Sequence, residues 1–173
     1  MPTYAVLLRG INVGGHNKVP MGDLRAVVES LGHTDVTTYI QSGNVVFTSK
    51  KNVTPAALER VIKNEFGFDI TVVLRTRAEL QRVVKDNPFA RADLKTVHVG
   101  FMASKPSPAA VRDLDTDQFA PDEFAIKGTD LYLHLPNGMG RTKLPPYLDR
   151  KLKIPTTVRN WNTVLKLLEL TAD

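Results

Sequence analysis

The residues best suited to chemistry are gathered in one loop near the N-terminus. Residues 9–18 link an apolar segment, 4–8, to a segment opened by Pro20. The polar, cationic and glycine positions of this loop are Arg9, Gly10, Asn12, Gly14, Gly15, His16, Asn17 and Lys18. A buried strand that runs through a glycine-rich loop into a helix is a common way to make an anion site, because backbone N–H groups point at the ligand.

The glycine spacing only partly matches a phosphate-binding loop. The Lys-Ser/Thr pair that should follow Gly15 is replaced by His16-Asn17, so the side chains that neutralise phosphate and hold magnesium are missing at that place. The dinucleotide-binding spacing G-x-G-x-x-G is also absent. A nucleoside triphosphatase is therefore not indicated. What the loop predicts is weaker anion binding through backbone N–H groups; the alternative is a loop whose glycines only allow a sharp turn.

A second polar group, Gln41-Ser42-Gly43-Asn44, separates two β-branched and apolar segments, 36–40 and 45–48, that read as a hairpin. In a βαββαβ unit the first strand and the second hairpin strand are neighbours and antiparallel. The hairpin turn should then lie beside the glycine loop, and Gln41, Ser42 and Asn44 could share a site with it. The alternative is a turn that is polar only for solubility.

The C-terminal part of the chain supplies the remaining candidate cations. Residues 137–173 contain 7 basic and 3 acidic side chains within a chain of net charge +5. Arg141, Lys143 and Arg159 are candidates to clamp an anion, with Arg159 just before an expected final helix that Asn160 or Asn162 caps. A solvated basic surface is the alternative.

Other catalytic arrangements are absent from the sequence. The four histidines have no metal-ligand spacing, there is no cysteine, and Ser42 lies outside a nucleophile elbow. We predict no metal site and no particular cofactor, and the residue types leave open whether the protein is an enzyme. His16 is the one candidate proton carrier beside the loop.

The elements that must position these residues follow from hydrophobic periodicity. Residues 1–75 read as β-α-β-β-α-β, residues 76–95 as a connecting helix and linker, and residues 96–173 as β-α-β-β-α without a closing strand. A long basic loop is expected over 136–159. We therefore predict an α+β protein of two ferredoxin-like subdomains with antiparallel sheets. No apolar run reaches the ~20 residues that span a bilayer, and no signal segment is evident, so we expect a cytoplasmic protein.

Five segments together resemble a widespread bacterial family, a domain of unknown function. They are LLRGINVGG (7–15), KVPM (18–21), TYIQSGNVVF (38–47), LPNGMGRTKL (135–144) and TVRNWNTVLKLLEL (157–170). The resemblance implies an α+β protein of two ferredoxin-like subdomains, and it implies no activity.

Three functional hypotheses follow. The first is a small anionic ligand, phosphorylated or carboxylated, bound in a basic cleft between the two halves. Its predicted contacts are Arg9, Asn12, Gly14, Gly15, Asn17, Lys18, Gln41, Ser42, Asn44, Arg141, Lys143 and Arg159. The second is an RNA-binding module that uses the basic C-terminal segment and a sheet face. The third is a structural or partner-binding protein in which the polar segments only hold the halves together. The sequence predicts no oligomeric state.

Overall fold

The protein forms two compact units. The computed structural model describes residues 1–12, 15–40, 43–115 and 117–172. Contacts group Met1–Arg82 with Lys166–Asp173 as the first unit and Val83–Leu165 as the second. No described helix is both long enough and apolar enough to span a membrane.

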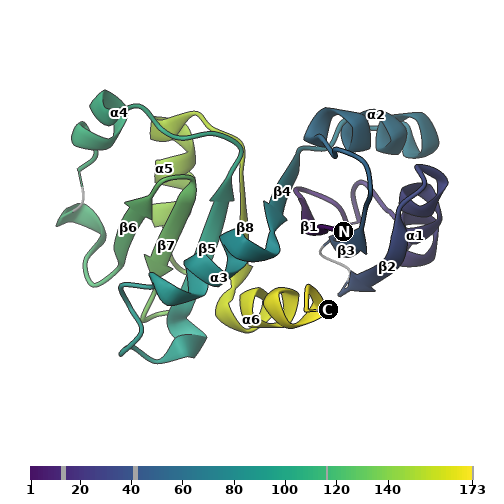
Figure 1. Ribbon diagram of the computed structural model, residues 1–173. Helices are drawn as coiled ribbons and strands as arrows, with labels where there is room; N and C mark the ends of the chain where they lie inside the picture. Colours follow the sequence, from purple (N-terminus) through teal and green to yellow (C-terminus); the bar gives the residue numbers. More distant parts are fainter. Residues whose placement is uncertain (13–14, 41–42, 116, 173) are drawn as a thin grey trace. The chain divides into compact units, whose positions relative to one another are not determined.

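The first unit is built on a four-stranded antiparallel sheet of order β2-β3-β1-β4. Its elements are β1 (Thr3–Leu8), α1 (Met21–Ser30), β2 (Thr34–Tyr39), β3 (Asn44–Thr48), α2 (Pro55–Phe66) and β4 (Val72–Thr76). In Figure 1 both helices lie over one face of this sheet. The β-α-β-β-α-β order predicted for residues 1–75 is confirmed, including the antiparallel pairing of β1 with β3.

The second unit repeats this topology, with strand order β6-β7-β5-β8. Its strands are β5 (Val97–Met102), β6 (Glu123–Lys127), β7 (Asp130–His134) and β8 (Thr156–Asn160). Its helices α4 (Pro108–Arg112) and α5 (Leu144–Leu152) share a core with β5 and β7. The helices α3 (Arg77–Lys85) and α6 (Trp161–Leu170) follow the two closing strands, and short 3-10 turns span Leu94–Thr96 and Asp117–Phe119. The predicted fold class is confirmed.

Two expectations for the second half are wrong. Residues 136–159 do not form one long loop, because they contain all of α5 and most of β8. The unit also has its closing strand, since β8 pairs antiparallel with β5. Pro145 and Pro146 suggested a loop, but proline is tolerated in the first helical turn, where a backbone N–H needs no intrahelical partner.

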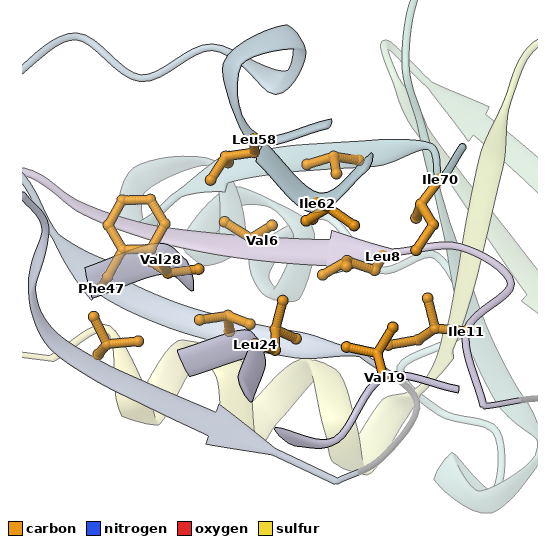
Figure 2. Close-up of a cluster of buried hydrophobic side chains, with 13 residues drawn as sticks. Val6, Leu8, Ile11, Val19, Leu24, Val28, Phe47, Leu58, Ile62 and Ile70 are labelled. Atoms are coloured by element: carbon orange, nitrogen blue, oxygen red, sulfur yellow. The ribbon is translucent and has the colours of Figure 1, made fainter. Parts of the chain in front are cut away.

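The core of the first unit also anchors the glycine loop. Figure 2 shows Val6 and Leu8 of β1 among side chains of the two helices, with Ile11 and Val19 at the end of the cluster. Ile11 and Val19 are each 1% exposed, and they lie near the two ends of the loop. Burial of such side chains stabilises a fold by roughly 1.5–3 kcal/mol each, so both ends of the loop are held to the core.

Side-chain caps begin four of the described helices, including α4, where the Ser107 hydroxyl accepts from the Ala110 N–H at 3.2 Å. The Thr54 hydroxyl accepts a hydrogen bond from the Ala57 N–H, and Pro55 occupies the first turn of α2. Thr76 and Glu79 form a reciprocal capping box at α3, with donor–acceptor distances of 3.2 and 2.8 Å. Asn160 caps α6 by accepting from the Thr163 N–H at 2.8 Å.

A buried histidine, His33, is expected to make the stability of the first unit depend on pH. His33 stacks on Phe47 with ring centroids 4.3 Å apart, and its Nδ1 lies 3.0 Å from the Ser49 hydroxyl. That hydroxyl also lies 3.1 Å from the Lys51 carbonyl, and when it donates its proton there it accepts from the Nδ1–H of His33. Burial, and then the charge of Lys51, lower the pKa of His33.

We expect acid to destabilise the protein through this group. The folded state binds the His33 proton less readily than the unfolded chain. The free energy of unfolding should therefore be highest above the ordinary histidine pKa of 6.5 and fall as the pH drops from there through the lowered folded-state value. Urea unfolding across this range should give a shallower pH dependence for His33→Gln than for the wild type. An unchanged slope would contradict this role. The pKa of His98 is lowered in the same direction, and the comparison of the two proteins cancels its contribution.

Candidate functional site

Two asparagines fold the glycine loop. The Asn12 side chain donates to the Val19 carbonyl at 3.0 Å and accepts from the Val19 N–H at 2.8 Å. The Asn17 side chain donates to the Gly10 carbonyl at 3.1 Å, and the Asn12 N–H donates to the Asn17 carbonyl at 3.1 Å. Asn12 and Asn17 have φ of 55° and 50°, a region that asparagine tolerates better than most residues. Their side chains shape the loop, whereas the sequence-based prediction used them as ligand contacts.

The folded loop encloses one side of a surface pocket of about 370 Å³. Its lining residues are Asn12, Gly15, Lys18, Val19 and Pro20. Gly15 adopts φ 77°, and a Cβ there would meet nothing within 4 Å, so the space beside its backbone is accessible to a ligand. Lys18 is exposed and has no hydrogen bond or ion pair within the described residues. This pocket, the loop pocket, contains three of the predicted site residues.

The loop pocket adjoins the start of α1, which no side chain caps. Pro20 occupies the N-cap position with extended backbone, and the Leu24 N–H is the first to bond back, to the Pro20 carbonyl at 3.0 Å. The preceding helical N–H groups therefore lack intrahelical partners. Asp23 places a carboxylate in this first turn and partly offsets the positive end of the helix dipole.

The hairpin turn lies against the loop, as predicted. The Leu8 N–H donates to the Gly43 carbonyl at 2.8 Å, and a Cβ on Gly43 would lie 2.8 Å from Ile11 Cδ1. Asn44 is fully buried, and its side chain donates to the Tyr39 carbonyl at 3.0 Å. The buried Asn44 side chain therefore bridges the two ends of the hairpin turn. The predicted contacts Gly14, Gln41 and Ser42 lie outside the described residues.

The remaining predicted cations have different environments. Arg9 is exposed at the start of the loop, where its N–H donates to the Thr71 carbonyl at 3.0 Å. Arg141 and Lys143 line a separate pocket in the second unit. The structure therefore brings Asn12, Gly15 and Lys18 together in one unit and Arg141 and Lys143 together in the other. The cleft between the two halves stays a prediction.

Arg159 is a strand residue whose side chain is turned inward. It belongs to β8, is 8% exposed, and donates to the Thr157 hydroxyl at 2.8 Å and the Val158 carbonyl at 3.0 Å. Burial lowers its pKa to about 10, so the guanidinium stays charged at neutral pH. These contacts make Arg159 part of the internal structure.

Sequence reasoning missed the counterpart of Arg159 in the first unit. Arg75 in β4 is 7% exposed and donates to the Leu74 carbonyl at 2.9 Å, as Arg159 does to Val158. Each arginine directly precedes the capping residue of the next helix, and each lies opposite a β1 or β5 residue in equivalent register. The sequence contains a sign of this burial. Arg75 lies two residues after the buried Val73, so the two side chains share one face of the strand.

The described residues contain no cluster of three side chains that could hold a metal ion. Tyr132 is buried and donates to the Val83 carbonyl at 2.7 Å; burial, with the charges of Asp130 and Asp86, raises its pKa far above the usual value. A phenol held in this way is structural.

A family model described as "Protein of unknown function (DUF1697)" matches residues 1–132. The chain belongs to the DUF1697 family. The matched residues include the whole glycine loop and hairpin turn, and end within β7. Arg141, Lys143 and Arg159 lie beyond them.

A solved structure has a similar fold over nearly the whole chain. The conserved bacterial protein SP0830 from Streptococcus pneumoniae is similar, with a TM-score of 0.74, 24% sequence identity and coverage of 99% of each chain. At this identity the similarity bears on the fold alone. No functionally curated protein matches the chain.

Proposed function

We propose that this DUF1697 protein binds a small anionic ligand, phosphorylated or carboxylated, in the loop pocket. The observation that carries the proposal is the pocket of about 370 Å³ around Lys18 and Gly15, with its wall held by the Asn12 side chain. Pockets of about 300–1,000 Å³ accommodate small molecules. The proposal retains the cytoplasmic location that the sequence predicts.

Lys18 and backbone N–H groups would hold the anion. The Lys18 ammonium has no partner among the described residues, and hydrogen bonds between charged groups are about twice as strong as neutral ones. The uncapped start of α1 adds N–H groups and the positive end of a helix dipole beside the pocket. Asn12 would contribute indirectly, by holding the pocket wall in place, because the two polar atoms of its side chain are hydrogen-bonded to Val19.

The proposal is for binding, with chemistry left as a separate question. His16 is exposed two residues from Lys18 and is the nearest proton carrier in the chain. A reaction would need this ring to face the ligand.

The two other hypotheses explain less of the site. RNA readout by a four-stranded sheet needs an open sheet face for base stacking. The four consecutive residues Ala5–Leu8 of β1 are all buried, so both faces at this central strand are covered, and Leu131–Leu133 of β7 are buried likewise. A purely structural role accounts for Asn44 and Arg159, but it gives no reason for an unpartnered Lys18 beside an open pocket.

Thermal unfolding with inorganic phosphate tests the proposal. At a phosphate concentration ten times the dissociation constant, binding adds about 1.4 kcal/mol to the free energy of unfolding, or a Tm increase of roughly 3–5 °C. We expect this increase for the wild type and its loss in Lys18→Gln.

Lys50→Gln is the matched control, because it removes an exposed lysine of the same unit that lies outside the pocket. It should respond to phosphate as the wild type does, with sodium chloride at equal ionic strength as the blank. The same phosphate response in Lys18→Gln and Lys50→Gln would refute the site.

A further inference from the structure

A second pocket lies entirely within the second unit, and its position is fixed by α5. Its volume is about 480 Å³, and it is lined by Gln118, Phe119, Ala120, Pro121, Asp122, Asn137, Arg141, Thr142 and Lys143. The walls are two loop segments, 118–122 and 137–143. We call this the α5 pocket.

Both walls are tied to neighbouring structure, so the pocket is preformed. The Thr142 hydroxyl donates to the Asp122 carboxylate and accepts from the Leu144 N–H at 3.1 Å. On the other wall, the Phe119 ring packs on Tyr147 with centroids 4.7 Å apart, and the Asp115 N–H donates to the Tyr147 hydroxyl at 2.8 Å. A ligand would therefore meet walls that are already ordered, which lowers the cost of binding.

Two cations in this pocket have no structural partner. Arg141 and Lys143 are exposed, and neither side chain has a hydrogen bond or ion pair within the described residues. The one carboxylate in the lining, Asp122, already accepts from Thr142. The lining thus has two cations and one anion.

Helix capping does not explain these two cations. The Leu144 N–H is satisfied by Thr142, Pro145 and Pro146 have no N–H, and the Tyr147 N–H donates to the Lys143 carbonyl at 3.2 Å. Arg141 and Lys143 also lie at the start of α5, where the helix dipole is positive and repels cations. A bound anion would offset this repulsion.

Two other cations of α5 are, by contrast, explained by the fold. Arg150 and Lys151 lie in the last turn, where the helix dipole favours positive charge. Each is also 5.9 Å from the centroid of the Tyr147 ring. They therefore form a natural internal comparison for the pair in the pocket.

We infer that the α5 pocket binds the phosphate group of a small phosphomonoester, with Arg141 and Lys143 as its charged contacts. The arginine fork and lysine ammonium suit a dianionic group. The volume exceeds the needs of a bare ion, and Phe119, Ala120 and Pro121 provide an apolar wall for the organic part. Asn137 supplies an amide for a polar substituent. The proposal is independent of the loop pocket, because every residue it uses lies in the second unit.

The test is an NMR titration with phenyl phosphate and, separately, inorganic phosphate. We expect saturable shifts of amides in residues 118–122 and 137–143 with phenyl phosphate, and weaker binding of inorganic phosphate at the same amides. Arg141→Gln combined with Lys143→Gln should raise the dissociation constant for phenyl phosphate at least about tenfold, the loss expected when two charge-assisted contacts are removed.

The matched control is Arg150→Gln combined with Lys151→Gln, which removes the same charge from the last turn of α5, at the opposite end from Arg141 and Lys143. It should change the dissociation constant less than about twofold, since exposed charges outside the pocket are screened by solvent and salt.

Four outcomes would contradict parts of this proposal. Equal losses of affinity in the two double variants would show binding to a diffuse basic surface, such as one for nucleic acid, and not to the α5 pocket. An absence of saturable shifts at these amides in the wild type would overturn the site. Equal affinity for both probes would overturn the contact with the organic part. Shifts confined to residues 12–22 would support the loop pocket while refuting this one.

Discussion

Replacing Gly43 by alanine should lower the free energy of unfolding by about 2–4 kcal/mol. Gly43 has φ 91°, where a side chain costs roughly 1–2 kcal/mol. The added Cβ would also lie 2.8 Å from Ile11 Cδ1 and 3.0 Å from Leu8 Cβ. Both neighbours are buried in the core, so they cannot move aside without a packing cost of about 1–3 kcal/mol. Urea unfolding of the variant and the wild type measures the difference.

Gly15→Ala separates the two contributions. Gly15 has a similar φ, 77°, but a Cβ there would have no neighbour within 4 Å. This variant should therefore lose only the backbone contribution, about 1–2 kcal/mol. If the two alanine variants were equally destabilised, the close approach of the hairpin turn to the glycine loop would be wrong.

Asn12→Ala should have the second large effect, a loss of about 2–4 kcal/mol together with the phosphate response. The change removes both hydrogen bonds to Val19, a residue that is 1% exposed, and leaves its backbone groups with poor access to water. An unsatisfied buried polar group costs about 1–3 kcal/mol. Alanine also tolerates the φ of 55° less well than asparagine does. Chemical denaturation and the phosphate-induced Tm shift measure the two losses.

Two further variants at position 12 separate the loss of the side-chain hydrogen bonds from the backbone strain. Asn12→Gly removes the side-chain bonds without the backbone strain, so it should be more stable than Asn12→Ala by about 1 kcal/mol. Asn12→Asp keeps the acceptor for the Val19 N–H but opposes a carboxylate to the Val19 carbonyl, and it should be destabilised despite its similar size. A wild-type phosphate response in all three variants would mean that the wall of the loop pocket does not depend on Asn12.

The meeting of the loop and the hairpin turn was predictable because it depends on patterns that are local in sequence. The apolar run 4–8 and the β-branched hairpin 36–48 specify strands, and a βαββαβ order then makes β1 and β3 neighbours. The roles of Asn12 and Asn17 were not predictable in the same way. Their side chains bond backbone groups seven residues away, so the same residue types serve equally as ligand contacts or as loop supports until the fold brings those groups close.

The errors in the second half have a similar physical origin. β8, with sequence TTVRN, is a short edge strand that carries a buried arginine, so its polar residues hide the strand pattern. Arg159 was therefore interpreted as a cation in front of a helix, whereas pairing with β5 turns its side chain inward. The first unit has the same arrangement at Arg75. The two arginines occupy equivalent positions in the closing strands β4 and β8.

The central claim is that Lys18 and Gly15 border an anion site, and a ¹⁵N NMR titration with inorganic phosphate tests it most directly. We predict saturable shifts at the amides of Gly15 and Lys18 and at the start of α1, absent with sodium chloride at matched ionic strength and lost in Lys18→Gln. Shifts at these amides that follow ionic strength alone, or that persist in Lys18→Gln, would contradict the claim.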